Sequence, residues 1–195
     1  AEILCIRTQS QIPSVWANKV RGILSRSQGY DHLLTYRRET KTTAACGYLA
    51  HYCDRAVAEH AILVAMVLLR KFKKQMENFN TFNRDGITGR ECRGKNVLVV
   101  GVGHIGAQAV DVARGLKMNV KGVDIKPKKK GLIYVSLKEG MAWADVVVCA
   151  LPLTNLTRGL LNYPIFKRAR QGLIFVNISR GEISPLKDLK RLLEE

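Results

Sequence analysis

The chain has 195 residues, of which 47% are hydrophobic and 25% are charged, values that are ordinary for a globular protein of one or two domains. The net charge is +16, but the positive residues are scattered, and the single real cluster, at 126–130, has no interleaved aromatic residue. We therefore favour a solvated basic surface over nucleic-acid binding. The most apolar stretch, residues 56–69, contains Glu59 and His60 and is too short to span a bilayer, which excludes a membrane-spanning protein.

The cysteines indicate the redox environment. Their spacing contains no Cys-x-x-Cys pair and matches no metal-ligand pattern with histidine. We therefore expect reduced thiols, no metal site and a cytoplasmic location, and the start of the chain has no signal-peptide pattern. The five are Cys5, Cys46, Cys53, Cys92 and Cys149.

Residues 1–53 read as a small α/β unit. A strand is expected over residues 1–7, a short helix near 12–16, and a second strand over 20–25. The polar loop 26–32 contains Gly29, where backbone amides can face a ligand, although an ordinary β-to-α turn explains this spacing equally well. Residues 40–53 are expected to be irregular.

A long helix is expected next, over residues 55–78, with Asp54 as its cap. From Val57 to Leu69 its apolar residues cover most of the circumference, which predicts burial between domains or subunits. A loop follows over residues 79–92, where asparagine and glycine are frequent.

The strongest motif occupies residues 97–106 (VLVVGVGHIG). Four apolar residues predict a buried strand, and Gly101, Gly103 and Gly106 then follow at the G-x-G-x-x-G spacing, before a helix over 107–116. A second strand, 119–123, ends at Asp124, where a carboxylate normally accepts the ribose 2′-hydroxyl. The free N–H groups of the helix would hold a pyrophosphate. The motif therefore predicts a dinucleotide site.

Further strands are expected over 133–137, 145–150 and 173–178, and helices over 164–170 and 185–195. Strands that alternate with helices predict a doubly wound parallel sheet. Ligands bind such sheets at the carboxyl ends of the strands, where Leu151-Pro152 and the loop with Arg180 follow. The Arg180 guanidinium would either bind a carboxylate in a forked arrangement or neutralise phosphate or solvent.

Four segments, in order, carry a family resemblance: residues 55–71, 89–106, 145–162 and 172–183. With these segments the chain resembles the D-isomer-specific 2-hydroxyacid dehydrogenases. The resemblance implies a Rossmann-type sheet over residues 54–195, as a dinucleotide-binding domain incomplete at its C-terminal end. It also implies a partial, flavodoxin-like α/β substrate domain over residues 1–53.

The same resemblance assigns roles to individual residues. Arg180 falls on the catalytic arginine that orients a 2-oxo acid, and Ser27, Gln28 and Gly29 fall on the loop whose amides hold the substrate carboxylate. The helix from Arg55 falls on the helix around which family members form homodimers. The implied cofactor-binding residues are Gly101, Gly103, His104, Ile105, Gly106, Asp124, Leu151, Pro152, Ile178 and Arg180.

One departure concerns the family's glutamate and histidine, which lie beyond the arginine motif. This chain stops at Glu195, so we expect it to be part of a longer enzyme and to lack both ends. The glutamate and the histidine are then expected outside these residues. None of the four histidines, His32, His51, His60 and His104, matches the family position, and His51 is the strongest of these weak candidates.

The predicted function is hydride transfer between NAD(H) and a D-2-hydroxy acid/2-oxo acid pair. The histidine would transfer the proton, and the glutamate would raise its pKa. Asp124 favours NAD over NADP, although Lys126 and the lysines at 128–130 offset its repulsion of a 2′-phosphate. The alternative is an NAD(H)-sensing binding protein, similar to corepressor relatives, without turnover.

Overall fold

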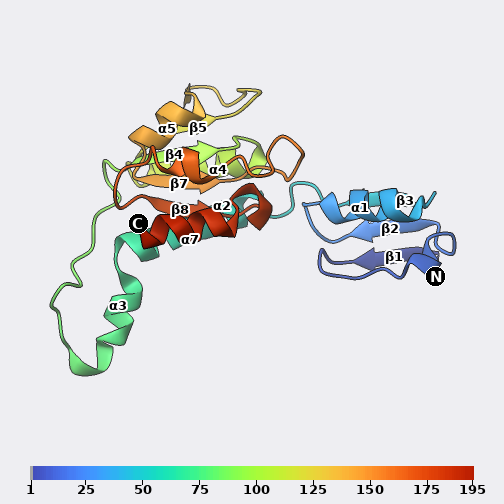
Figure 1. The fold of residues 1–195 in the computed structure, drawn as a ribbon, viewed down its shortest axis with the longest axis horizontal. Helices are drawn as coiled ribbons and strands as arrows, with labels where there is room; N and C mark the ends of the chain where they lie inside the picture. Colours follow the sequence, from blue (N-terminus) through green and yellow to red (C-terminus); the bar gives the residue numbers. More distant parts are fainter. Residues whose placement is uncertain (1) are drawn as a thin grey trace. The chain divides into compact units, whose positions relative to one another are not determined.

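The computed structural model describes residues 2–195. Contacts divide the chain into two compact units, the first ending at Cys53 and the second running from Asp54 to Glu195, and each is described by itself (Figure 1). Among the described residues, no helix has the length and apolarity needed to cross a membrane.

The first unit is a three-stranded parallel sheet in the order β1-β2-β3. The strands are β1 (Ile3–Ile6), β2 (Gly22–Ser25) and β3 (Ala45–Tyr48), joined by a 3₁₀ turn, η1 (Ser14–Trp16), and by α1 (Asp31–Thr40). Its core contains Ile6, Ala17, Ile23, Leu33, Tyr36 and Ala44.

Two expectations for this unit are wrong. The segment 40–53 is not irregular throughout, because Ala45–Tyr48 pairs in register with β2 and so satisfies its backbone groups. The loop expected over 26–32 is also shorter, since α1 begins at Asp31. The short sequence ACGY lacks the alternation of polar and apolar residues that identifies a strand.

The second unit is a five-stranded parallel sheet in the order β6-β5-β4-β7-β8. Alternate residues of β4 enter different cores, because successive side chains of a strand point to opposite faces. Val97 and Val99 pack with α2 and α4, whereas Leu98 and Val100 pack with α5, α6 and η3. The strands are β4 (Asn96–Val100), β5 (Asn119–Val123), β6 (Ile133–Tyr134), β7 (Val146–Cys149) and β8 (Ile174–Asn177).

The helices of this unit cover both faces of the sheet, which confirms the doubly wound architecture. They are α2 (Asp54–Leu69), α3 (Phe72–Glu77), η2 (Phe79–Thr81), α4 (His104–Gly115), α5 (Leu137–Trp143), α6 (Tyr163–Phe166), η3 (Gly181–Ile183) and α7 (Leu186–Glu194).

The single helix expected over 55–78 is divided into α2 and α3. Lys71 adopts a left-handed backbone conformation, with φ of 53°. The carbonyl oxygen of Leu69 accepts a hydrogen bond from the N–H of Arg90 at 2.8 Å, so the returning loop takes the acceptor that the next helical turn needs. The helix is also buried on one side only, because Leu63 and Leu68 are 55% and 51% exposed.

Helix α5 replaces the end of the strand expected over 133–137. Ser136 and Glu139 form a capping box, in which the Ser136 hydroxyl accepts from the Glu139 N–H and the Glu139 carboxylate accepts from the Ser136 N–H. Helix α4 begins at His104, three residues earlier than expected, so the first turn contains His104, Ile105 and Gly106.

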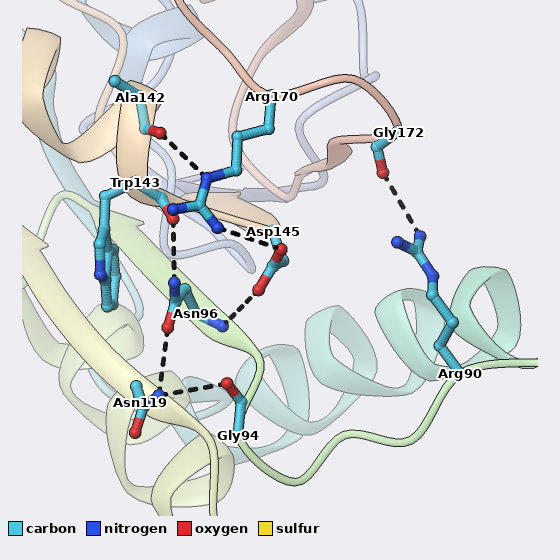
Figure 2. A network of polar contacts seen from close by, with 9 residues as sticks. All are labelled: Arg90, Gly94, Asn96, Asn119, Ala142, Trp143, Asp145, Arg170 and Gly172. Atoms are coloured by element: carbon cyan, nitrogen blue, oxygen red, sulfur yellow. Dashed lines mark hydrogen bonds and ion pairs between the residues drawn. The ribbon is translucent and has the colours of Figure 1, made fainter.

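A polar network holds together the amino ends of the central strands (Figure 2). The N–H of Asn96 donates to Asp145 Oδ2 at 2.9 Å, and Asn96 Nδ2 donates to the Trp143 carbonyl at 3.1 Å. Asn119 Nδ2 donates to Asn96 Oδ1 at 3.1 Å, and Arg170 lies 3.8 Å from Asp145. This network stabilises the edge of the sheet opposite to the one where a ligand is expected.

Candidate functional site

The backbone of the loop between β4 and α4 requires glycine at two positions. Gly101 has φ of 91°, and a Cβ atom there would lie 2.8 Å from the carbonyl oxygen of Ala150. A Cβ atom on Gly106 would overlap the carbonyl oxygen of Gly101. The segment after β7 therefore excludes a side chain at Gly101, and the packing of α4 against the glycine loop excludes one at Gly106.

Gly103 differs from both, because a Cβ atom there would meet no atom within 4 Å. The space beside Gly103 is thus open, directly before the first turn of α4, where His104 is exposed and Ile105 is half-buried. The N–H groups of a helix's first turn and its dipole attract an anion. Open backbone at the start of this 12-residue helix fits the pyrophosphate of a dinucleotide.

Asp124 lies directly after β5 and binds two backbone N–H groups. Its Oδ2 accepts from Val102 at 2.8 Å, and its Oδ1 accepts from Lys126 at 2.8 Å. The first of these bonds holds the glycine loop. Because a carboxylate oxygen accepts more than one hydrogen bond, both oxygens retain capacity for ribose hydroxyls. Its bond to the glycine loop was not predicted, since it joins residues 22 positions apart.

The loop after β7 contains Leu151 and Pro152. Leu151 is half-buried and Pro152 is exposed. The Thr157 hydroxyl donates to the Pro152 carbonyl at 2.6 Å and accepts from the Thr154 N–H at 2.8 Å, so threonine side chains hold this turn in one shape.

The loop after β8 carries Arg180, which is half-buried and donates from Nη1 to the Ser179 carbonyl at 3.2 Å. Asn177 organises this loop: its Oδ1 accepts from the Ser179 N–H at 2.9 Å, and its Nδ2 donates to the Arg180 carbonyl and to Ser184 Oγ, each at 3.0 Å. The sequence-based prediction missed Asn177, and its place directly before the Ser-Arg-Gly loop is the signal that was available.

Cys149 lies beneath this loop, at the end of β7. The Ser179 hydroxyl donates to the Cys149 carbonyl at 3.1 Å. Burial raises the pKa of the Cys149 thiol, which therefore stays protonated and packs as a small apolar group.

The strand register brings the candidate residues of this unit to one edge. Val100 pairs with Val123 and with Cys149, and Cys149 pairs with Asn177, so four parallel strands end level with one another. Every candidate residue in this unit follows one of these ends: Gly101, Gly103, His104, Ile105, Gly106, Asp124, Leu151, Pro152, Ile178 and Arg180. This edge can therefore accommodate a dinucleotide beside the Arg180 loop.

The three remaining candidates, Ser27, Gln28 and Gly29, lie in the first unit, in the loop between β2 and α1. The Ser27 hydroxyl donates to the Gly29 carbonyl at 2.8 Å, and the Cys53 thiol donates to Gln28 Oε1 at 3.5 Å. All three residues are half-buried.

Residues 60–195 match the protein family described as D-isomer specific 2-hydroxyacid dehydrogenase, NAD binding domain. The chain belongs to this family. NAD is the cofactor of the matched domain, which contains the glycine loop, Asp124 and Arg180. The predicted family and cofactor are therefore confirmed.

Two curated relatives of this family member are dehydrogenases. A D-lactate dehydrogenase of Curvularia clavata is 29% identical over 185 residues, which are 92% of this chain and 53% of the relative. The 2-hydroxyacid dehydrogenase A of Aspergillus oryzae is 30% identical over 191 residues, 93% of this chain and 55% of the relative. This family member thus spans about half the length of these two curated relatives.

A solved structure supports the fold at similar identity. The apo-structure of D-lactate dehydrogenase from Escherichia coli superposes with a TM-score of 0.86 and 27% identity, covering all of this chain and 65% of that one. The expected α/β class, with a Rossmann-type sheet, is confirmed.

Proposed function

We propose that the protein transfers a hydride between NAD(H) and a D-2-hydroxy acid/2-oxo acid pair. Family membership supports this reaction class, and the register of β4, β5, β7 and β8 carries the proposal. Because these strands end level, Arg180 follows the same sheet edge as the glycine loop and Asp124. An arginine that forks onto a carboxylate is suited to a substrate whose carboxylate adjoins a carbonyl.

When bound, NAD supplies the hydride chemistry. The chain's own residues bind and orient. In this proposal the N–H groups at the start of α4 hold the pyrophosphate and Asp124 accepts the ribose hydroxyls. Arg180 binds the substrate carboxylate and polarises its carbonyl oxygen, while the amides of Ser27, Gln28 and Gly29 hold the carboxylate. Proton transfer belongs to the family's histidine and glutamate, which match no residue of this chain.

We also propose roles for the two units. Residues 1–53 form part of the substrate domain, and residues 54–195 form the dinucleotide-binding domain. The contact division and the extent of the family match support this assignment. The exposed Leu63 and Leu68 of α2 support a homodimer, because large apolar groups on one helix are typical of an interface. The five free cysteines fit a reducing cytoplasm.

The test uses the purified full-length protein that carries this sequence. NADH absorbance is followed in the presence of pyruvate, glyoxylate or branched 2-oxo acids, and the chirality of the product is determined. We expect NADH oxidation with at least one of these acids and a D-configured product. Tight NADH binding without turnover of any 2-oxo acid would favour the sensing protein instead, an alternative that the dehydrogenase relatives do not favour.

A further inference from the structure

Four groups in the first unit form a continuous chain of hydrogen bonds. His32 Nε2 lies 2.9 Å from Ser25 Oγ, Ser25 Oγ lies 2.7 Å from Ser27 Oγ, and Ser27 Oγ lies 2.8 Å from the Gly29 carbonyl oxygen. The chain thus runs from helix α1, through the last residue of β2, to the loop that contains Ser27, Gln28 and Gly29.

The chemistry of these groups allows only one order of donors and acceptors along the hydrogen-bond chain. A carbonyl oxygen only accepts, so the one hydroxyl hydrogen of Ser27 lies on the bond to Gly29. Ser25 must then donate to Ser27, because Ser27 has no second hydrogen to give. With the Ser25 hydrogen used in this way, His32 must donate from Nε2 to Ser25 Oγ. The order is therefore His32, Ser25, Ser27 and Gly29, each donating to the next.

Ser25, at the centre of this hydrogen-bond chain, is fixed in the sheet and shielded from water. Ser25 is 0% exposed and pairs in the sheet with Ile6 and Tyr48 on the two neighbouring strands. A buried hydroxyl with both its donor and its acceptor roles satisfied is stable, whereas an unsatisfied one costs free energy. The loop itself contains Gly29, and glycine adopts many backbone conformations unless something restrains it.

We propose that His32, acting through Ser25 and Ser27, is a positioning residue for the substrate-carboxylate loop. The Ser27–Gly29 bond closes a turn around Gln28, and this restricts the directions of the Gln28 and Gly29 N–H groups. This inference rests on the proposed function, in which those N–H groups bind the carboxylate of a 2-oxo acid. The carboxylate takes no part in bond changes, so misdirected N–H groups weaken ground state and transition state alike.

Ser25→Ala in the full-length protein tests the proposal. It removes only the central hydroxyl, from a buried position. Thr42→Val is the matched control: Thr42 is 5% exposed, its hydroxyl donates to the Ala17 carbonyl and accepts from the Ala44 N–H, and it lies before the amino end of β3. Both variants lose buried hydrogen bonds of the first unit, but only Ser25→Ala interrupts the chain to Gly29.

We expect Ser25→Ala to raise the KM for pyruvate, or for the 2-oxo acid that the protein turns over best, about tenfold, with kcat changed less than about twofold. The dissociation constant of NADH should not change, and Thr42→Val should leave KM unchanged. Ser27→Ala should raise KM by the same factor, and adding Ser25→Ala to it should have no further effect, because both act on one bond.

Equal KM values for Ser25→Ala and Thr42→Val would overturn the proposal, as would additive effects of the two serine substitutions. If Ser25→Ala does not fold, Ser27→Ala decides alone, since Ser27 is only half-buried, and an unchanged KM then overturns it. Absence of turnover in the unaltered protein is a different result, because it contradicts the proposed function itself.

Discussion

Asp124 and Asn177 show how single polar residues hold the loops of the candidate site. Each lies at the carboxyl end of a strand, and each accepts a hydrogen bond from a loop N–H, Val102 for Asp124 and Ser179 for Asn177. Both side chains are half-buried, where a lost hydrogen bond is replaced only in part by water. Substitution of either residue therefore alters loop geometry as well as any ligand contact.

Asp124→Ala is expected to weaken NADH binding about tenfold or more and to improve NADPH binding relative to NADH. The absolute affinity for both falls, because the Val102 N–H loses its acceptor. The ratio shifts because a 2′-phosphate no longer meets a carboxylate, while Lys126 and Lys128 remain nearby in the sequence. Fluorescence titration with each cofactor measures both dissociation constants.

The control for this variant is Glu59→Ala, which removes an equal charge from α2, where Glu59 pairs with Arg55 at 2.6 Å and both side chains are 57% exposed. It should change neither affinity by more than about twofold, since exposed ion pairs contribute little. An equal loss of NADH and NADPH affinity in Asp124→Ala would contradict the role of Asp124 in cofactor choice.

Asn177→Ala is expected to lower kcat/KM for the 2-oxo acid about 10- to 100-fold, because the loop that carries Arg180 loses three hydrogen bonds. Asn96→Ala, which loses two side-chain hydrogen bonds at the opposite edge of the sheet, is the matched control. Both variants should lose about 1–3 kcal/mol of folding stability in denaturant titrations. If kcat/KM fell by the same factor in both variants, Asn177 would have no special role at the site.

Helix α2 combines a tightly packed side with an exposed one. Ala58, Ala61 and Ala65 are buried and let α2 approach α4 closely, while Leu63 and Leu68 are exposed. Val64 packs partly against the core, so it is a poorer probe of the exposed side. The exposed leucines are the groups that a second copy of the chain would cover.

Leu63→Glu and Leu68→Glu should therefore each convert the dimer of the full-length protein into a monomer, as measured by light scattering. The monomer should remain folded, with little change in its thermal unfolding. A buried charge without a partner is strongly unfavourable at an apolar interface. Lys73→Glu, at an exposed position of α3 that pairs with Glu77, serves as the control for added negative charge. A monomeric unaltered protein would rule the dimer out.

The dinucleotide unit could be predicted well from the sequence because its local signals agree. Val97 to Val100 is apolar and mostly β-branched, the glycines follow at fixed spacing, and β5 has the predicted bounds of residues 119–123. Close backbone contacts require glycine at positions 101 and 106, so the spacing of these glycines follows directly from the fold.

The parts that could not be predicted depend on tertiary contacts. The end of α2 is set by the Arg90 N–H and by a left-handed Lys71, and the helix-forming residues on either side give no sign of either. Strand β3 exists because β2 lies beside it. The roles of Asp124 and Asn177 in holding loops likewise depend on partners that only the folded chain brings near. By contrast, the Ser136–Glu139 capping box was visible in the sequence and was missed.

We propose that Arg180 binds the substrate at the carboxyl edge of this sheet, and the kinetics of Arg180→Gln in the full-length protein test this role. Arg168→Gln, at an exposed position after α6, is the control. We expect Arg180→Gln to lower kcat/KM for the 2-oxo acid at least about 100-fold with NADH affinity nearly unchanged, and Arg180→Lys to recover only part, because lysine lacks the planar fork. If Arg180→Gln and Arg168→Gln both kept the kcat/KM of the unaltered protein, Arg180 would have no role in substrate binding.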